Sequence, residues 1–152
     1  MDIEKLKEKI LTIIPDAVAE ENKQFPACVI PAAGFHSLCQ TLKDDPELAF
    51  DLLLCVSGVD WGKELGVTYH LSSTTLKHEL VLKVKTEDRE NPVFDTVADL
   101  WMTAEFHERE VYDMFGIRFN GHPDLRRMFL DESWVGYPLR KDYVDEVNIV
   151  QL

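Results

Sequence analysis

The feature that most constrains the fold is a pair of alternating apolar runs in the middle of the chain. Val67, Tyr69 and Leu71 alternate with polar residues, and Leu80, Leu82 and Val84 alternate with Val81 and two lysines. A repeat of two residues is typical of a β-strand with one buried face. The polar residues 73–78 lie between the two runs. The pattern therefore predicts an antiparallel hairpin at the centre of a sheet.

The first half of the chain adds two amphipathic helices to this hairpin. Apolar side chains recur at helical spacing in residues 3–14 and again in residues 32–43. A short strand is predicted at 27–30, and the apolar run 50–56 is compatible with a buried strand or with a helix. We expect an α+β fold of two layers, with a mixed β-sheet around the central hairpin and helices packed on one face.

A third helix is predicted before the last short strand. Thr96 is a suitable N-cap, and apolar residues at helical spacing continue from there to Phe115. Gly116 is the residue type that commonly ends a helix. Residues 117–119 are then long enough for a short strand.

The end of the chain has a different character. Gly and Pro recur from Asn120 onward, which is typical of extended chain with turns. We therefore predict one α+β domain over residues 1–119 and an extended C-terminal docking tail over residues 120–152.

Charge and cysteine content exclude several classes of partner. The net charge of −12 argues against nucleic acid and against an anionic membrane surface, since both need clustered Lys and Arg. The three cysteines form no CxxC pair and lie in apolar settings, so we expect buried free thiols in a reducing compartment. The N-terminus does not read as a signal peptide, and no apolar run approaches the ~20 residues that span a bilayer. Membrane association is expected only through a partner.

Motifs for chemistry are missing. The sequence has no Gly-rich dinucleotide fingerprint, no P-loop and no cysteine set for an iron–sulfur cluster. His107-Glu108 could begin a zinc protease motif, but Val111 stands where the second His would be. We predict no catalytic, cofactor-binding or metal-binding residue.

Charged residues follow helical spacing in the segment before Gly116. Glu105 and Asp113 lie four residues on either side of Arg109, so one guanidinium could bridge both carboxylates. On spacing alone, a salt-bridged helix edge is favoured over a functional cluster.

The residues that follow complete a longer pattern. The chain reads ERE-x-YDMFGI-x-F-x-GHPDLRR from Glu108 to Arg127, and a second piece runs from Trp134 through Gly136 to Pro138–Tyr143. This pattern resembles the signature of a respiratory complex I family, the C subunit or 30 kDa-type peripheral-arm subunit, and the resemblance covers roughly residues 50–143. One departure is Val144, where the family often has Pro. The signature residues are Glu108, Arg109, Glu110, Tyr112, Asp113, Phe115 and Gly116.

The resemblance implies a peripheral-arm subunit of a proton-translocating NADH:quinone oxidoreductase, a translocase. Such a protein lies on the cytoplasmic side of the inner (cell) membrane. It packs against the D subunit, which helps form the quinone pocket, and against other hydrophilic-arm subunits. It holds no cofactor, because NADH, FMN, iron–sulfur clusters and quinone are bound elsewhere in the complex. The isolated chain is therefore expected to be inactive.

The C-terminal tail suits such a role in assembly. Its basic and aromatic residue types are enriched at interfaces, and a segment too short for its own core gains order by docking. The residues expected at the partner interface are His122, Arg126, Arg127, Trp134, Arg140, Lys141 and Tyr143.

Two alternatives remain open. The chain could be the corresponding subunit of a membrane-bound energy-converting hydrogenase, or of another complex I relative with a different electron donor. It could also be a free-standing acidic protein-binding module. A gene neighbourhood that encodes quinone-site and cluster subunits would favour the complex, whereas a solitary gene would favour the module.

Overall fold

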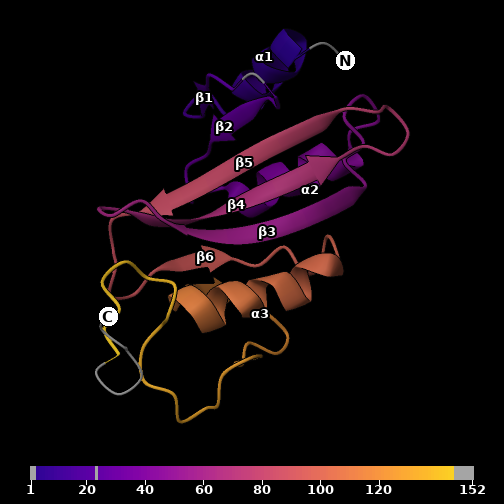
Figure 1. Ribbon diagram of the computed structural model, residues 1–152. Coiled ribbons are helices and arrows are strands. Elements are labelled where there is room, and N and C mark those ends of the chain that lie inside the picture. The colour runs from indigo at the N-terminus through magenta and orange to yellow at the C-terminus, as the bar shows by residue number, and fades with distance from the viewer. Residues whose placement is uncertain (1–2, 23, 146–152) are drawn as a thin grey trace.

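The fold is built around a five-stranded mixed sheet, seen in a computed structural model that describes residues 3–22 and 24–145 (Figure 1). The strand order is β1-β2-β5-β4-β3. Only the β2–β5 pair is parallel, and the other neighbours are antiparallel. The strands are β1 (Val18–Glu20), β2 (Ala27–Val29), β3 (Leu52–Asp60), β4 (Leu65–Ser72) and β5 (Glu79–Thr86).

The predicted hairpin is confirmed. Strands β4 and β5 pair antiparallel, with Tyr69 opposite Leu82 and Leu71 opposite Leu80. These apolar side chains are buried, because they point to the face of the sheet that carries the core. The apolar run 50–56, which the sequence left open between strand and helix, is mostly strand, since residues 52–56 belong to β3.

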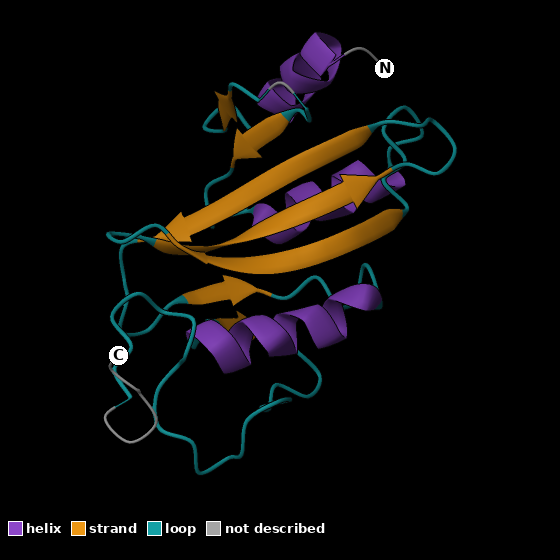
Figure 2. Cartoon of the chain, viewed as in Figure 1, coloured by secondary structure: helices purple, strands orange, loops and turns teal. Residues whose placement is uncertain are grey.

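Two helices pack beside this sheet. Helix α1 (Ile3–Ile13) buries Leu6 and Ile10, and helix α2 (Phe35–Asp44) lies across one face of the sheet (Figure 2). Both helices were predicted, although α2 begins three residues later than expected, after Gly34. The α+β class and the mixed sheet with its central hairpin are therefore confirmed.

The predicted start of the third helix is wrong. Helix α3 runs from Thr103 to Phe115, seven residues after Thr96. Thr96 instead follows strand β6 (Val93–Asp95), which pairs parallel with β7 (Arg118–Asn120) in a second, two-stranded sheet. The Thr96 N–H donates to the carbonyl of Asn120, which holds this residue at the end of the small sheet. Its hydroxyl accepts the N–H of Ala98, so Thr96 caps only the single turn that follows it and not helix α3. Residues 97–101 form a turn that buries the apolar side chains of Val97, Leu100 and Trp101 in the core.

The cysteines are free, as expected, but they differ in burial. Cys28 and Cys39 are buried, and burial raises the pKa of both thiols, whereas Cys55 on the edge strand β3 is only half-buried. After β7 the chain forms turns and extended segments that lie along α3 (Figure 1).

Candidate functional site

The candidate site is the joint between helix α3 and residues 121–145, which we call the C-terminal segment. Helix α3 lies beside the edge strand β3, below the main sheet in Figure 1. Ala104, Glu108, Val111 and Phe115 recur at helical spacing and are all buried. The signature residues therefore lie on a helix that contacts the sheet on one side and the C-terminal segment on the other.

Glu108 is a buried carboxylate on the inner side of α3. It accepts hydrogen bonds from the Thr96 hydroxyl and from the Val97 N–H, at 2.9 Å for the latter. Burial raises the pKa of Glu108 from its ordinary value of 4.5 to about 7, although both hydrogen bonds oppose the rise. Glu108 thus holds the turn before α3 against the helix, at the cost of burying an ionisable group.

Arg109 does not bridge Glu105 and Asp113, so that prediction is wrong. Its guanidinium reaches the C-terminal segment and donates to the main-chain carbonyls of Arg126 and Arg127, each at 3.2 Å. The helical spacing was correct, but the carbonyls of a segment 17 residues away compete for the same donors.

Asp113 is the acceptor around which the C-terminal segment is organised. One of its oxygens accepts three successive main-chain N–H groups, from Met128 at 3.2 Å, Phe129 at 2.7 Å and Leu130 at 3.2 Å. The other oxygen accepts from Arg127 at 3.0 Å. Burial raises the pKa of Asp113, but these donors outweigh it and hold the pKa below its usual range.

Arg127 belongs to the same network. Its guanidinium also donates to the carbonyls of Asp113, Trp134 and Gly136, and it lies 5.0 Å from the centre of the Tyr137 ring. Only 8% of its side chain is exposed. The hydrogen bonds of Arg127 are therefore all made to groups of its own chain, whereas Arg126 is exposed and pairs with Asp124.

A second set of contacts fixes the end of the segment. Arg140 donates to the carbonyls of Phe115 and Arg89, at 2.6 and 2.8 Å. The Lys141 N–H donates to Asp60, which also forms a paired hydrogen bond with Arg89. This ion pair holds the pKa of Asp60 far below its usual range. Sequence reasoning missed both Asp60 and Arg89, because nothing in their spacing links them to the C-terminal segment.

Gly116 allows the segment to pass close to the end of α3. Its φ of +70° suits glycine, and a Cβ there would lie 2.5 Å from the Tyr137 ring. Tyr112 on α3 also faces Tyr137, at 6.4 Å between ring centres. The signature glycine thus serves both the helix end and the packing of the segment.

His122 is likewise engaged inside the chain. Its Nε2 lies 2.8 Å from the carbonyl of Glu105, and its Nδ1 accepts the N–H of Asp124 at 3.0 Å. The ring is therefore neutral in this arrangement, with the proton on Nε2. Its side chain is fully buried.

The remaining expected residues are more open. Glu110 and Lys141 are exposed, and Trp134 and Tyr143 are half-buried. Of the residues expected at a partner interface, His122, Arg127 and Arg140 are bonded to the chain's own α3 or to Arg89, and Arg126 and Lys141 face outward. Contact of any of them with a partner stays a prediction.

Within residues 3–22 and 24–145, no group of three or more His, Cys, Asp or Glu side chains is arranged to hold a metal ion. In the same part of the chain, none of the helices is long and apolar enough to cross a bilayer. The joint is a structural network of carboxylates, guanidinium groups and main-chain carbonyls.

Relatives of this chain carry consistent names. A protein of Chloroherpeton thalassium, named as the C subunit of NADH-quinone oxidoreductase, is 50% identical over 146 residues, covering 93% of this chain and 60% of that protein. A protein of Phocaeicola vulgatus, named as the C/D subunit of the same enzyme, is 48% identical over 124 residues. That match covers 81% of this chain but 24% of the relative, so this chain spans only part of the length of either protein.

A solved structure shares the fold. It is a chain of the membrane-bound sulfane sulfur reductase, an archaeal respiratory membrane complex, and it is 27% identical with a TM-score of 0.72. The match covers 95% of this chain and 86% of that chain. Residues 28–147 also match the family described as the respiratory-chain NADH dehydrogenase, 30 Kd subunit. Since that match takes in most of the chain and the whole joint between α3 and the C-terminal segment, this protein belongs to the 30 Kd subunit family of the respiratory-chain NADH dehydrogenase.

Proposed function

We propose that this chain is a cofactor-free peripheral-arm subunit of a proton-translocating NADH:quinone oxidoreductase, located on the cytoplasmic side of the membrane. Its task is assembly: it docks on the D subunit through the C-terminal segment. Other subunits hold NADH, FMN, the iron–sulfur clusters and quinone, and the isolated chain does not catalyse the reaction.

The observation that carries this proposal is the contrast between the inner and outer sides of the C-terminal segment. On the inner side, Asp113 and Arg127 bind it through main-chain groups. On the outer side, it leaves five large apolar side chains exposed, and a segment held in this way gains nothing for its own core by exposing them. These side chains are Met128, Phe129, Val135, Leu139 and Val144, with exposed fractions from 38% to 88%.

The D subunit is the partner that the relatives favour. The Phocaeicola vulgatus protein and one from Bacteroides thetaiotaomicron are both named as a C/D subunit, and this chain matches about a quarter of each. In such a protein the two subunits share one polypeptide and must lie within reach of each other. A separate chain needs a docking surface instead, and exposed aromatic and aliphatic side chains are suited to that purpose.

The test compares two sets of exposed apolar residues. Phe129→Ser with Val135→Ser changes the C-terminal segment, whereas Val18→Ser changes an equally exposed side chain on β1, away from this segment. All three positions are at least 62% exposed, so we expect the isolated variants to melt like the unmodified chain. The tagged proteins are then purified from their own cells in mild detergent, and the recovery of the D subunit and NADH:quinone activity are measured.

We expect the double variant to lose most of the D subunit and the Val18→Ser variant to keep it. Equal recovery of the D subunit with both proteins would remove the C-terminal segment from the interface. Purification of the unmodified chain without any other subunit would favour the free-standing binding module instead.

The two neighbouring arginines have separable roles in this proposal. Arg127→Ala should destabilise the isolated chain, because it removes the cation that pairs with buried Asp113. Arg126→Ala should leave its melting unchanged and act only on assembly, since this side chain is 62% exposed. A lower melting temperature in both variants would show that both arginines stabilise the isolated fold.

A second candidate function is supported by the fold shared with a chain of the sulfane sulfur reductase complex. In that case the protein would serve a membrane complex with another electron donor. Membranes from cells with and without the gene separate the two functions. Loss of NADH-dependent quinone reduction supports the first, and its retention with loss of sulfane sulfur reduction supports the second.

A further inference from the structure

One signature residue takes no part in the joint between α3 and the C-terminal segment. Glu110 lies on α3, and its side chain is exposed. The other signature residues all contact other parts of the chain, through hydrogen bonds or through packing. An exposed Glu on a helix is commonly solvated, so the surroundings of Glu110 decide whether it has a further role.

The neighbours of Glu110 on its own helix supply no cation. Side chains three or four positions away are neighbours on a helix, and here they belong to Phe106, His107, Asp113 and Met114. Of these, His107 alone could carry a positive charge, but its Nδ1 accepts the N–H of Val56 at 3.1 Å. The ring is therefore neutral in this arrangement, with its proton on Nε2. Glu110 forms no ion pair with a described residue.

Glu110 lies at the rim of a groove between α3 and the edge strand β3. The groove has a volume of about 300 Å³. Because the Val56 N–H bonds to His107 on α3, the N–H and C=O of Val56 both point away from β4 and toward α3. The groove thus combines a carboxylate and a strand-edge carbonyl with apolar walls. These walls are formed by Val56, Val111, Met114, Phe115 and Leu139.

The groove is continuous with the docking surface proposed for the C-terminal segment. Leu139 lines the groove and is also one of the exposed apolar residues of that segment, with an exposed fraction of 55%. Its N–H donates to the carbonyl of Met114 at 3.1 Å, which holds it at the end of α3. A partner that covers Leu139 therefore also reaches the groove.

We propose that this groove receives an arginine side chain of the D subunit. The guanidinium donates to the Glu110 carboxylate and to the Val56 carbonyl, and the apolar stem packs between the walls of the groove. Arginine suits these two acceptors better than lysine, because its planar group presents several donors in a fixed arrangement. The net charge of −12 also favours a basic surface on the partner. This inference rests on the proposed function, since it names one group through which the same partner is held.

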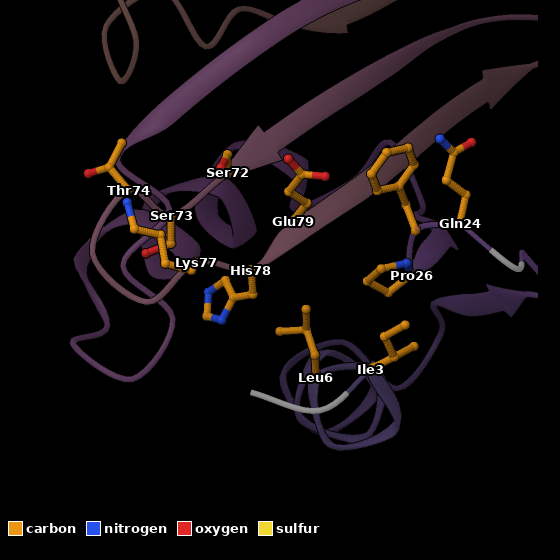
Figure 3. Close-up of a pocket in the computed structure, with 11 residues that line it drawn as sticks. Ile3, Leu6, Gln24, Pro26, Ser72, Ser73, Thr74, Lys77, His78 and Glu79 are labelled. Carbon is orange, nitrogen blue, oxygen red and sulfur yellow. The ribbon is translucent and has the colours of Figure 1, made fainter.

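The first experiment reverses the charge of Glu110 and of a matched residue. Glu79 is the control, because it is also exposed and forms no ion pair with a described residue. It lies beside a cavity of about 500 Å³ between α1 and the link between β4 and β5, across the sheet from α3 (Figure 1). Its carboxylate points away from His78 and Leu6, which also line that cavity (Figure 3).

Glu110→Lys, Glu110→Gln and Glu79→Lys are each purified from their own cells through a tag on this chain. Since both positions are exposed, we expect the isolated variants to melt within about 2 °C of the unmodified protein. Glu110→Lys should recover about tenfold less D subunit, because it places a cation against the arginine, and Glu110→Gln should lose less. Glu79→Lys should recover as much as the unmodified chain. Equal recovery with Glu110→Lys and Glu79→Lys would overturn the proposal.

The second experiment identifies the side chain in the groove. The arginines of the D subunit are replaced by Glu one at a time, in cells that carry Glu110→Lys. One replacement should restore recovery of the D subunit, because it re-forms an ion pair with the charges exchanged, and it should lower recovery with the unmodified chain. A set in which no replacement restores recovery would refute an arginine as the occupant.

The outcomes also separate this inference from the proposed function. If Glu110→Lys assembles normally while Phe129→Ser with Val135→Ser does not, the groove is refuted and docking of the C-terminal segment stands. If the unmodified chain recovers no D subunit, the proposed function fails and this inference fails with it. Should Glu110→Lys lower the melting temperature, Glu110→Gln decides, because it keeps the shape of the side chain and removes only the charge.

Discussion

Asp113→Ala tests whether one carboxylate holds the C-terminal segment in place. The substitution leaves the buried Arg127 guanidinium without its counter-charge and removes the acceptor of three main-chain N–H groups. Breaking a buried ion pair by deleting one partner typically costs about 3–5 kcal/mol. In a chain of this length, that cost corresponds to a fall of about 6–20 °C in melting temperature.

Two measurements on the isolated chain check this prediction. Thermal unfolding gives the change in melting temperature, and hydrogen exchange reports the amides of Met128, Phe129 and Leu130, which should lose protection. Asp124→Ala is the matched control, since its carboxylate is exposed and pairs only with exposed Arg126, and its melting should be nearly unchanged. An Asp113→Ala protein that melts like the control and keeps all three amides protected would refute the reasoning.

Four further substitutions test other parts of the site and core. Glu108→Gln should remove a pH dependence of stability. The pKa of Glu108 in the folded chain, about 7, exceeds its ordinary value of 4.5, so the free energy of unfolding of the unmodified chain falls by up to ~3 kcal/mol as pH rises between these values. The melting temperatures of both proteins at pH 5 and pH 8 check this. Tyr69→Phe should leave the melting temperature unchanged or raise it, since the fully buried hydroxyl has no hydrogen-bond partner among the described residues, and a clear fall would show that it has one. Gly116→Ala should destabilise by at least ~1 kcal/mol in chemical denaturation, because alanine resists a φ of +70° and its Cβ would displace Tyr137. Arg109→Ala should lower the free energy of unfolding by about 1–3 kcal/mol in the same assay, because the carbonyls of Arg126 and Arg127 lose their donor. An unchanged denaturation midpoint would contradict this.

Much of the fold could be predicted because local patterns encode it. The alternation around Tyr69 and Leu82 indicated the hairpin, and helical spacing indicated the two helices near residues 3–14 and 32–43. The helix predicted from Thr96 failed for an identifiable reason. The sequence pattern of residues 96–104 suits a helix, but the pairing of β6 with β7 holds Thr96 at the end of a strand. That pairing joins two segments that are far apart in the chain and leaves no local signal.

The family signature likewise identified which residues matter but not what they contact. Sequence alone determined that Arg109 and Asp113 belong to one pattern on a helix, and their spacing suggested that they pair with each other. Only the tertiary structure decided that Arg109 donates to carbonyls near residue 126 and that Asp113 binds Arg127. The physical reason is that helical spacing fixes which side chains share a face, whereas the partner of a charged group is the best donor or acceptor brought there by the whole fold.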